Sequence, residues 1–139
     1  MTTFRQAGLI LLIAAGLAGV TAAVHPKRPV FVAPPTDPNQ VNLAQVQHWA
    51  GSVLWVDARP DAEFVSGHIP ESISLNFENW PEQFPKFLDH YSPDRRVVVY
   101  CSATSCQLSR EIAEKLRTSG ITDAYFLEGG WEAWKQAHP

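Results

Sequence analysis

A buried strand that runs directly into a helix, with a cysteine at the junction, constrains the fold of this chain more than any other feature. Val97–Tyr100 is β-branched and aromatic without a polar interruption, which predicts a strand covered on both faces. A leucine or isoleucine then recurs at every fourth position from Leu108 to Leu116, and Gly120 follows as a helix stop. Cys101 is therefore expected at the carboxyl end of a strand, the edge at which parallel α/β sheets bind ligands.

The residues after Cys101 favour a chemical role for its sulfur. They are Ser102, Ala103, Thr104, Ser105, Cys106 and Gln107. Small side chains let the backbone curl around the sulfur, and the start of the following helix directs unpaired N–H groups and a positive dipole end toward it. Because this setting stabilises a thiolate, we interpret Cys101 as a reactive cysteine and not as a buried structural one.

The composition excludes several classes of function. With 139 residues, of which 45% are hydrophobic, the chain is long enough for one domain and too short for two. The net charge is −3, and the part from Gln40 onward is more acidic than basic, so we expect no nucleic-acid partner. Two cysteines are too few for a disulfide scaffold, and no nearby histidine completes a zinc pattern, so we expect neither a metal nor a cofactor.

The amino-terminal region contains a segment that suits a membrane. Ala7–Val24 has no charged residue, and as a helix it would extend roughly 27 Å, close to the roughly 30 Å of a bilayer core. We predict that residues 1–24 are a retained single-pass anchor that contacts the membrane through residues 7–24. Because this leader resembles an export signal, we expect the domain on the outer (periplasmic or extracytoplasmic) side. The alternative is a secreted protein whose signal is cleaved.

The rest of the chain divides into a linker and a domain. Residues 25–39 contain five of the eleven prolines, which predicts an extended spacer. Residues 40–139 alternate between strand and helix patterns. Strands are expected at Val53–Val56, Ile73–Leu75, Val97–Tyr100 and Ala124–Leu127, and helices at Leu43–Trp49, at Trp80–Tyr91, from Ser105 and from Gly130. This alternation predicts an α/β domain with a parallel β-sheet flanked by helices on both faces.

Three segments of the domain together resemble the rhodanese domain, the fold of a family of sulfurtransferases. They are Val56–Arg59 with Glu63-Phe64 and Gly67–Pro70, the Cys101 loop with its helix, and Leu127–Trp131 with Trp134. Their order and spacing match the family over nearly all of residues 40–139. The resemblance implies a rhodanese-like parallel sheet, here preceded by one hydrophobic amino-terminal helix.

The resemblance also implies that Cys101 is a catalytic nucleophile. In that family the cysteine thiolate takes a sulfane sulfur from a small donor, becomes a persulfide and passes the sulfur to a thiol or another nucleophile. The loop from Ser102 to Gln107 would then bind the substrate. A persulfide is anionic near neutral pH, so backbone N–H groups and a helix terminus suit it better than a general base would.

Three charged residues are accessory candidates. Asp57 follows a buried strand and Arg59 lies two residues on, so both are expected at the same rim of the sheet as Cys101, where we interpret them as a structural ion pair. Arg110 lies one turn into the helix after the loop and either supplies positive charge to it or faces solvent. His68 is interpreted as a hydrogen-bonded structural histidine, not as an acid or base.

The loop departs from the usual family pattern, which has an arginine five residues after the cysteine and a serine six residues after it. Those positions hold Cys106 and Gln107 here. If Ser109 is aligned with the family serine instead, the loop is two residues longer and Leu108 replaces the arginine. The arginine is absent in both alignments. Thiosulfate, a dianion often bound through that arginine, is therefore not expected to be a good donor.

Two other functions stay open on the sequence alone. Cys101 and Cys106 lie across a strand-to-helix turn at a spacing that allows a disulfide, which would make the domain a thiol redox module. The domain could also be a catalytically silent binding module. A phosphatase of the related cell-cycle type is excluded, because its phosphate loop requires an arginine where this chain has Gln107. No pattern defines an oligomeric state.

Overall fold

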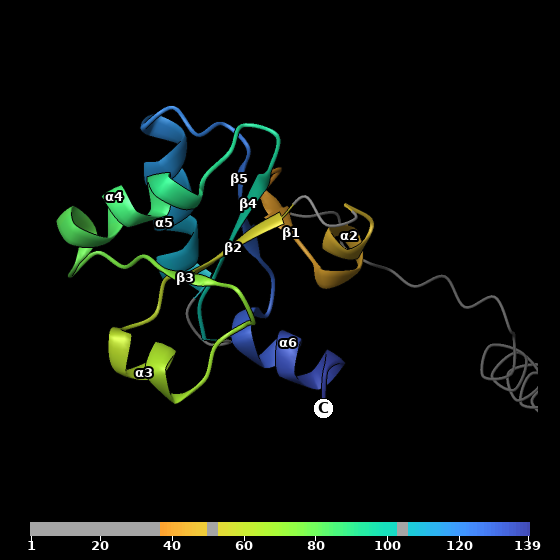
Figure 1. The fold of residues 1–139 in the computed structure, drawn as a ribbon. Coiled ribbons are helices and arrows are strands. Elements are labelled where there is room, and N and C mark those ends of the chain that lie inside the picture. The colour runs from red at the N-terminus through yellow and green to blue at the C-terminus, as the bar shows by residue number, and fades with distance from the viewer. Residues whose placement is uncertain (1–36, 50–52, 103–105) are drawn as a thin grey trace, which may run out of the picture. The chain divides into compact units, whose positions relative to one another are not determined.

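The computed structural model describes residues 37–49, 53–102 and 106–139, in which short strands alternate with helices (Figure 1). In chain order the elements are β1 (Gln40–Val41), α2 (Leu43–Gln47), β2 (Val53–Asp57), α3 (Asp61–Ser66), β3 (Ile73–Ser74), α4 (Trp80–His90), β4 (Arg96–Tyr100), α5 (Cys106–Thr118), β5 (Ala124–Leu127) and α6 (Gly130–Ala137). Each of the helices and strands expected from the sequence is present, with ends that differ by a few residues.

The strands form one parallel sheet in the order β1-β5-β4-β2-β3, which confirms the predicted parallel arrangement. β4 lies at the centre of the sheet, between β5 and β2. The register aligns Asp57 of β2 with Tyr100 of β4, and the amide of Ala58 donates to the carbonyl oxygen of Tyr100 at 2.9 Å. The carboxyl ends of these two strands therefore meet at the edge where Cys101 follows.

Helices cover both faces of the sheet because successive strand residues point to opposite sides. Val97 and Val99 pack into a hydrophobic cluster with side chains of α4 and α5, whereas Val98 and Tyr100 pack into a second cluster with side chains of α2 and α6. Figure 1 shows α4 and α5 together on one side of the sheet and α2 on the other. The burial on both faces that the uninterrupted β4 pattern predicts is confirmed.

Two short elements, β1 and α3, were not expected from the sequence. β1 has two residues and is extended by a hydrogen bond from the Phe126 amide to the Asn39 carbonyl oxygen. α3 has six residues, begins after Pro60 without a side-chain cap, and contains no buried residue. Neither element has the apolar periodicity on which a prediction from sequence depends.

The predicted membrane anchor lies outside the described residues, as does most of the predicted linker. Within the described ranges, none of the helices combines the length and the apolar character needed to cross a bilayer. The anchor in residues 1–24 therefore stays a prediction from sequence.

Candidate active site

Cys101 lies at the carboxyl end of β4 with only 1% of its surface exposed. Ser109, near the start of α5, is fully buried, and its hydroxyl donates to Cys101 Sγ over a donor–acceptor distance of 3.4 Å. When it is protonated, the same sulfur donates a hydrogen bond to the carbonyl oxygen of Ser102 at 3.2 Å. A hydroxyl donor stabilises a sulfur anion more than a neutral thiol. The contact with Ser109 therefore suits a thiolate at Cys101 and, by the same argument, a persulfide.

The start of α6 holds the backbone of Cys101 in place. The amide of Trp131 donates to the Cys101 carbonyl oxygen at 2.7 Å. Gly130 has a φ of +49°, and a Cβ atom at this position would lie 2.0 Å from the same oxygen. Only glycine permits both this conformation and this approach. This close passage fixes the backbone of the candidate nucleophile.

Asp57 and Arg59 form a buried ion pair at the same edge of the sheet. Arg59 Nη2 lies 2.6 Å from Asp57 Oδ2 and donates to the carbonyl oxygen of Gly67 at 2.7 Å. The Arg59 guanidinium also lies 5.1 Å from the ring centroid of Trp131. Burial disfavours the charge of this guanidinium, but the hydrogen bond to Asp57 raises the pKa of Arg59 above its ordinary value. This geometry is that of the structural ion pair expected from the sequence.

Glu63, on α3, brings a carboxylate to the start of the Cys101 loop. Its Oε2 accepts a hydrogen bond from Ser102 Oγ at 3.0 Å and lies 3.5 Å from Arg59 Nη1. About half of the Glu63 side chain, 49%, is exposed to solvent. From the sequence, Glu63 is part of the motif that resembles the rhodanese family and is not among the expected site residues. Its position four residues after Arg59 is the signal that could have identified it.

Of the loop residues expected to bind the substrate, the structure describes Ser102 at the site and Gln107 away from it. Ser102 lies at the site, between Cys101 and Glu63. Residues 103–105 and the side chain of Cys106 lie outside the described part of the chain. Gln107 is exposed, and its Nε2 donates to Glu111 Oε1 one turn further along α5, at 2.8 Å. The Cys101–Cys106 disulfide therefore stays an alternative that the described residues do not test.

Arg110 makes its described contacts away from the Cys101 loop. Its Nε lies 3.6 Å from Asp37 Oδ2, and its guanidinium lies 5.0 Å from the ring centroid of Phe126 on β5. About half of the side chain, 49%, is exposed. Of the two roles considered for Arg110, the exposed one fits these contacts, and none of them brings its charge to Cys101.

Ser109, and not Gln107, makes a described contact with the Cys101 sulfur. The hydroxyl of Ser109 contacts this sulfur, whereas the Gln107 side chain contacts Glu111. In the alignment that matches Ser109 to the family serine, Leu108 takes the place of the family arginine. Ser109 was considered in the sequence analysis only as an alignment alternative, and its contact with the sulfur adds it to the site.

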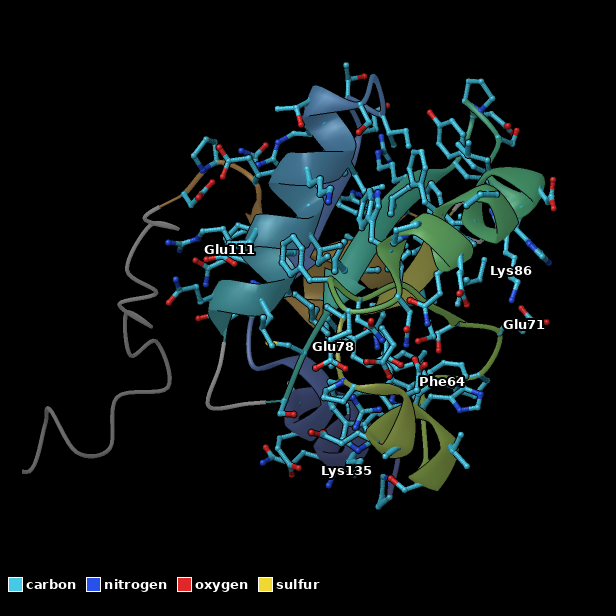
Figure 2. The ribbon with its side chains drawn as sticks, turned by 90° about the vertical axis from the view of Figure 1, so that its left-hand side faces the viewer. Phe64, Glu71, Glu78, Lys86, Glu111 and Lys135 are labelled. Carbon is cyan, nitrogen blue, oxygen red and sulfur yellow. The ribbon has the colours of Figure 1, made fainter. Side chains whose placement is uncertain are left out.

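The segment around His68 is held beside the site by structural hydrogen bonds. The buried Tyr100 hydroxyl accepts from the amide of Ile69 at 3.1 Å, and burial raises the pKa of Tyr100, which keeps the phenol neutral. His68 Nδ1 lies 2.9 Å from the carbonyl oxygen of Phe64, and the two rings stack with centroids 4.0 Å apart. Figure 2 shows Phe64 on α3. The structural interpretation of His68 agrees with these contacts.

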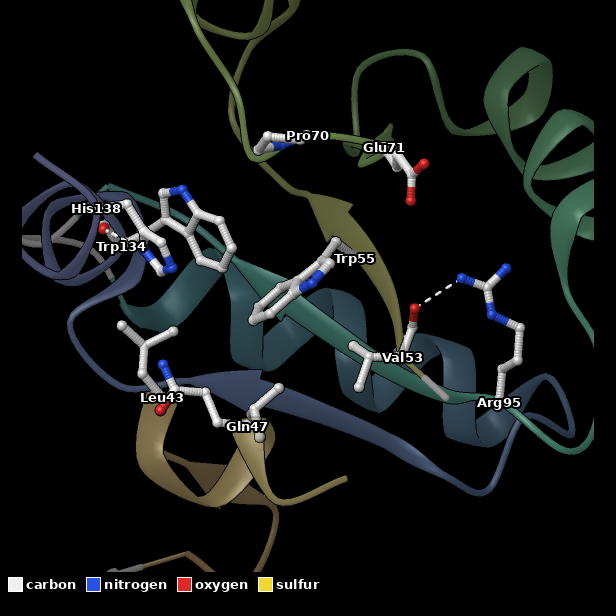
Figure 3. A pocket seen from close by; sticks show the side chains of 10 residues that line it. Leu43, Gln47, Val53, Trp55, Pro70, Glu71, Arg95, Trp134 and His138 are labelled. Atoms are coloured by element: carbon white, nitrogen blue, oxygen red, sulfur yellow. Dashed lines mark hydrogen bonds between the residues drawn. The ribbon is translucent and has the colours of Figure 1, made fainter. Parts of the chain in front are cut away.

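A cavity of about 310 Å³ lies between α2, β2 and α6 (Figure 3). Its walls include Trp55 and Trp134, and Arg95 and Glu71 lie toward one end. Among the residues that the structure describes, none that lines this cavity belongs to the Cys101 loop. Within the part of the chain that the structure describes, no group of three or more His, Cys, Asp or Glu residues is arranged to hold a metal ion.

Comparisons of sequence and structure identify the family and the fold of this chain. The family model of the Rhodanese-like domain matches residues 41–137, and the chain belongs to this family. The human single-domain sulfurtransferase TSTD1 superposes with a TM-score of 0.60 over 74% of this chain and 100% of its own, at 18% identity. A rhodanese-related protein from Thermoplasma volcanium superposes with a TM-score of 0.58 over 72% of this chain and 93% of its own, at 21% identity. These likenesses concern the fold.

Curated relatives share higher sequence identity. Thiosulfate sulfurtransferase GlpE of Shewanella oneidensis is 36% identical over 89 residues, which cover 64% of this chain and 82% of that protein. GlpE of Pseudomonas syringae pv. syringae is 32% identical over 96 residues, which cover 69% of this chain and 84% of that protein. The uncharacterized protein slr1261 of Synechocystis is 34% identical over 87 residues, 62% of this chain and 45% of that protein. The match therefore spans less than half of slr1261 and most of each GlpE.

Proposed function

We propose that this protein is a sulfurtransferase that carries a sulfane sulfur as a persulfide on Cys101. The observation that carries the proposal is the buried sulfur at the end of β4, which accepts a hydrogen bond from Ser109 while Trp131 holds the Cys101 backbone. The name of the GlpE relatives, thiosulfate sulfurtransferase, supports the same class of reaction.

The reaction has two displacement steps. In the first, the Cys101 thiolate attacks the sulfane sulfur of a donor, a new S–S bond forms, and the rest of the donor leaves with the electron pair of the broken bond. In the second, an acceptor thiolate attacks the outer sulfur of the persulfide and Cys101 leaves as a thiolate. Both steps start and end with sulfur anions, so donors of hydrogen bonds contribute more than a general base would.

The described charges favour donors that carry less negative charge than thiosulfate. Arg59 is already paired with Asp57, and the described contacts of Arg110 are with Asp37 and Phe126. Leu108, in the alignment that matches Ser109 to the family serine, supplies no charge where the family arginine stands. We therefore propose a small sulfane-sulfur donor of low charge and a thiol acceptor.

Transfer of sulfur to a thiol tests this function directly. The purified protein, with methanethiosulfonate as donor and dithiothreitol as acceptor, should release sulfide, and Cys101→Ser should abolish the release without changing the circular dichroism spectrum. Ser119→Ala, at an exposed position outside the loop, is the control and should retain activity. Activity that survives in Cys101→Ser would assign the reaction to another group.

We also propose that residues 7–24 anchor the domain at the outer side of a membrane. The uncharged Ala7–Val24 segment supports this proposal. Labelling of intact cells with a membrane-impermeant maleimide, with and without mild prior reduction, should modify the protein's thiols. Labelling that requires permeabilised cells would contradict the outward orientation.

A further inference from the structure

We propose that Glu63 determines donor specificity by excluding highly charged anions from Cys101. The proposal rests on the sulfurtransferase function proposed above and adds to it a selection of the donor by charge. The described contacts of the Glu63 side chain are with Ser102 and Arg59, whereas Ser109 contacts the sulfur and Trp131 contacts the Cys101 backbone, so the role of Glu63 is distinct from theirs.

The location of the Glu63 carboxylate is set by two contacts. Glu63 Oε2 accepts from the hydroxyl of Ser102, the residue that directly follows the nucleophile, at 3.0 Å. It also lies 3.5 Å from Arg59 Nη1. The first contact keeps a negative charge at the entrance to the loop, and the second directs part of the Arg59 charge toward Glu63 and away from an incoming anion.

The charges of the three side chains in this ion-pair group, Asp57, Arg59 and Glu63, do not cancel. Arg59 contributes one positive charge, and the carboxylates of Asp57 and Glu63 contribute two negative charges, so the three side chains carry one net negative charge. Asp57 is fully buried, whereas 49% of the Glu63 side chain is exposed. Glu63 is therefore the carboxylate of this group that an approaching donor meets.

Two sulfur donors of similar shape and different charge distinguish exclusion by charge from a general loss of activity in a Glu63 variant. Thiosulfate is a dianion, and its attack by the Cys101 thiolate breaks the S–S bond and releases sulfite. Methanethiosulfonate is a monoanion in which a methyl group replaces one oxygen, and the same attack releases methanesulfinate. Because a Coulomb energy is proportional to the donor charge, Glu63 should oppose thiosulfate twice as strongly in free energy as methanethiosulfonate.

The test is the substitution Glu63→Gln, which removes the charge and keeps an oxygen that can accept from Ser102. With cyanide as acceptor and thiocyanate as product, kcat/KM should rise about threefold for methanethiosulfonate, the size expected of one partly exposed charge pair. It should rise about tenfold for thiosulfate, the square of the first factor. Added salt should reduce both gains.

Two matched variants identify the cause. Ser102→Ala removes the hydrogen bond that holds the Glu63 carboxylate beside the loop, so its ratio of the two kcat/KM values should shift from that of the wild type toward that of Glu63→Gln. Glu114→Gln removes an exposed carboxylate on α5, outside the loop, and should leave both kcat/KM values unchanged. Equal gains for the two donors in Glu63→Gln, or losses for both, would overturn the charge-exclusion role.

A binding measurement separates failure of this inference from failure of the proposed function. In Cys101→Ser, which cannot form a persulfide, calorimetry should show about tenfold tighter thiosulfate binding when Glu63→Gln is added. If the wild type transfers no sulfur from either donor, the sulfurtransferase function is wrong, and this binding difference still tests Glu63. Unchanged thiosulfate affinity would contradict the role of Glu63 even in an active enzyme.

Discussion

At the scale of single residues, the site depends on which groups contact one sulfur atom. Ser109 Oγ lies 3.4 Å from Cys101 Sγ, and both side chains are buried. A hydrogen bond to a buried anion contributes about 1.5–3 kcal/mol, more than a bond between neutral groups. Ser109 therefore belongs to the candidate site because it touches the atom that we propose carries the transferred sulfur.

We expect Ser109→Ala to slow persulfide formation on Cys101 by roughly tenfold, the loss of one hydrogen bond to a charged group. Rapid mixing of the protein with methanethiosulfonate under single-turnover conditions measures this step alone. Ser119→Ala, at an exposed position after α5, is the control and should react at the wild-type rate. A wild-type rate in Ser109→Ala would show that the contact does not stabilise the reacting anion.

At the scale of elements, two short helices, α6 and α3, position groups of the candidate site. α6 begins where Gly130 passes against the carbonyl oxygen of Cys101, and α3 positions Glu63 beside Ser102. α3 itself is tied to the following segment through Asp61, whose carboxylate accepts hydrogen bonds from Ser74, Asn76, Asn79 and Gln83. The positions of both elements are therefore sensitive to single substitutions.

We expect Gly130→Ala to lower the free energy of unfolding by at least about 3 kcal/mol, since it combines an unfavourable φ with a steric overlap. Gly120→Ala is a matched control, because Gly120 also has a positive φ, +96°, but a Cβ atom there would meet nothing within 4 Å. It should cost only about 1–2 kcal/mol. Urea unfolding compares the two, and equal losses would contradict the close approach to Cys101.

Acid should weaken the attachment of α3. Burial raises the pKa of Asp61, but the four hydrogen bonds outweigh this effect and hold the pKa below its ordinary value. A carboxyl group with a lowered folded-state pKa stabilises the fold at higher pH, and this stabilisation is lost as the pH falls through about 4 and below. The stability difference between the wild type and Asp61→Asn, measured by urea unfolding, should be constant near neutral pH and shrink in that acidic range. A difference that grows on acidification would contradict the lowered pKa.

At the scale of the whole molecule, the core was predictable from sequence and the details of the site were not. The uninterrupted apolar pattern of β4 and the four-residue repeat of α5 depend on burial, which a sequence reveals through periodicity. The contact of Ser109 with the sulfur and the position of Glu63 depend on how α5 and α3 approach the sheet. The contact of Glu63 with Ser102 joins residues that are distant in sequence, and no local pattern predicts either contact.

We expect residues 35–139 to fold without the preceding segment. They form one compact unit, in which Asp37 pairs with Arg110 and the Asn39 carbonyl oxygen accepts from the Phe126 amide. A chain that begins at Pro35 should unfold cooperatively in urea, with circular dichroism and tryptophan fluorescence giving the same midpoint. Aggregation of this chain, relieved by restoring residues 1–34 in detergent, would contradict the expectation.

The most direct test of the central claim is the intact mass of the protein after incubation with methanethiosulfonate. The wild type should gain the mass of one sulfur atom and lose it again when cyanide is added, whereas Cys101→Ser should keep its original mass throughout. An unmodified wild type, or the same gain in Cys101→Ser, would contradict a persulfide on Cys101.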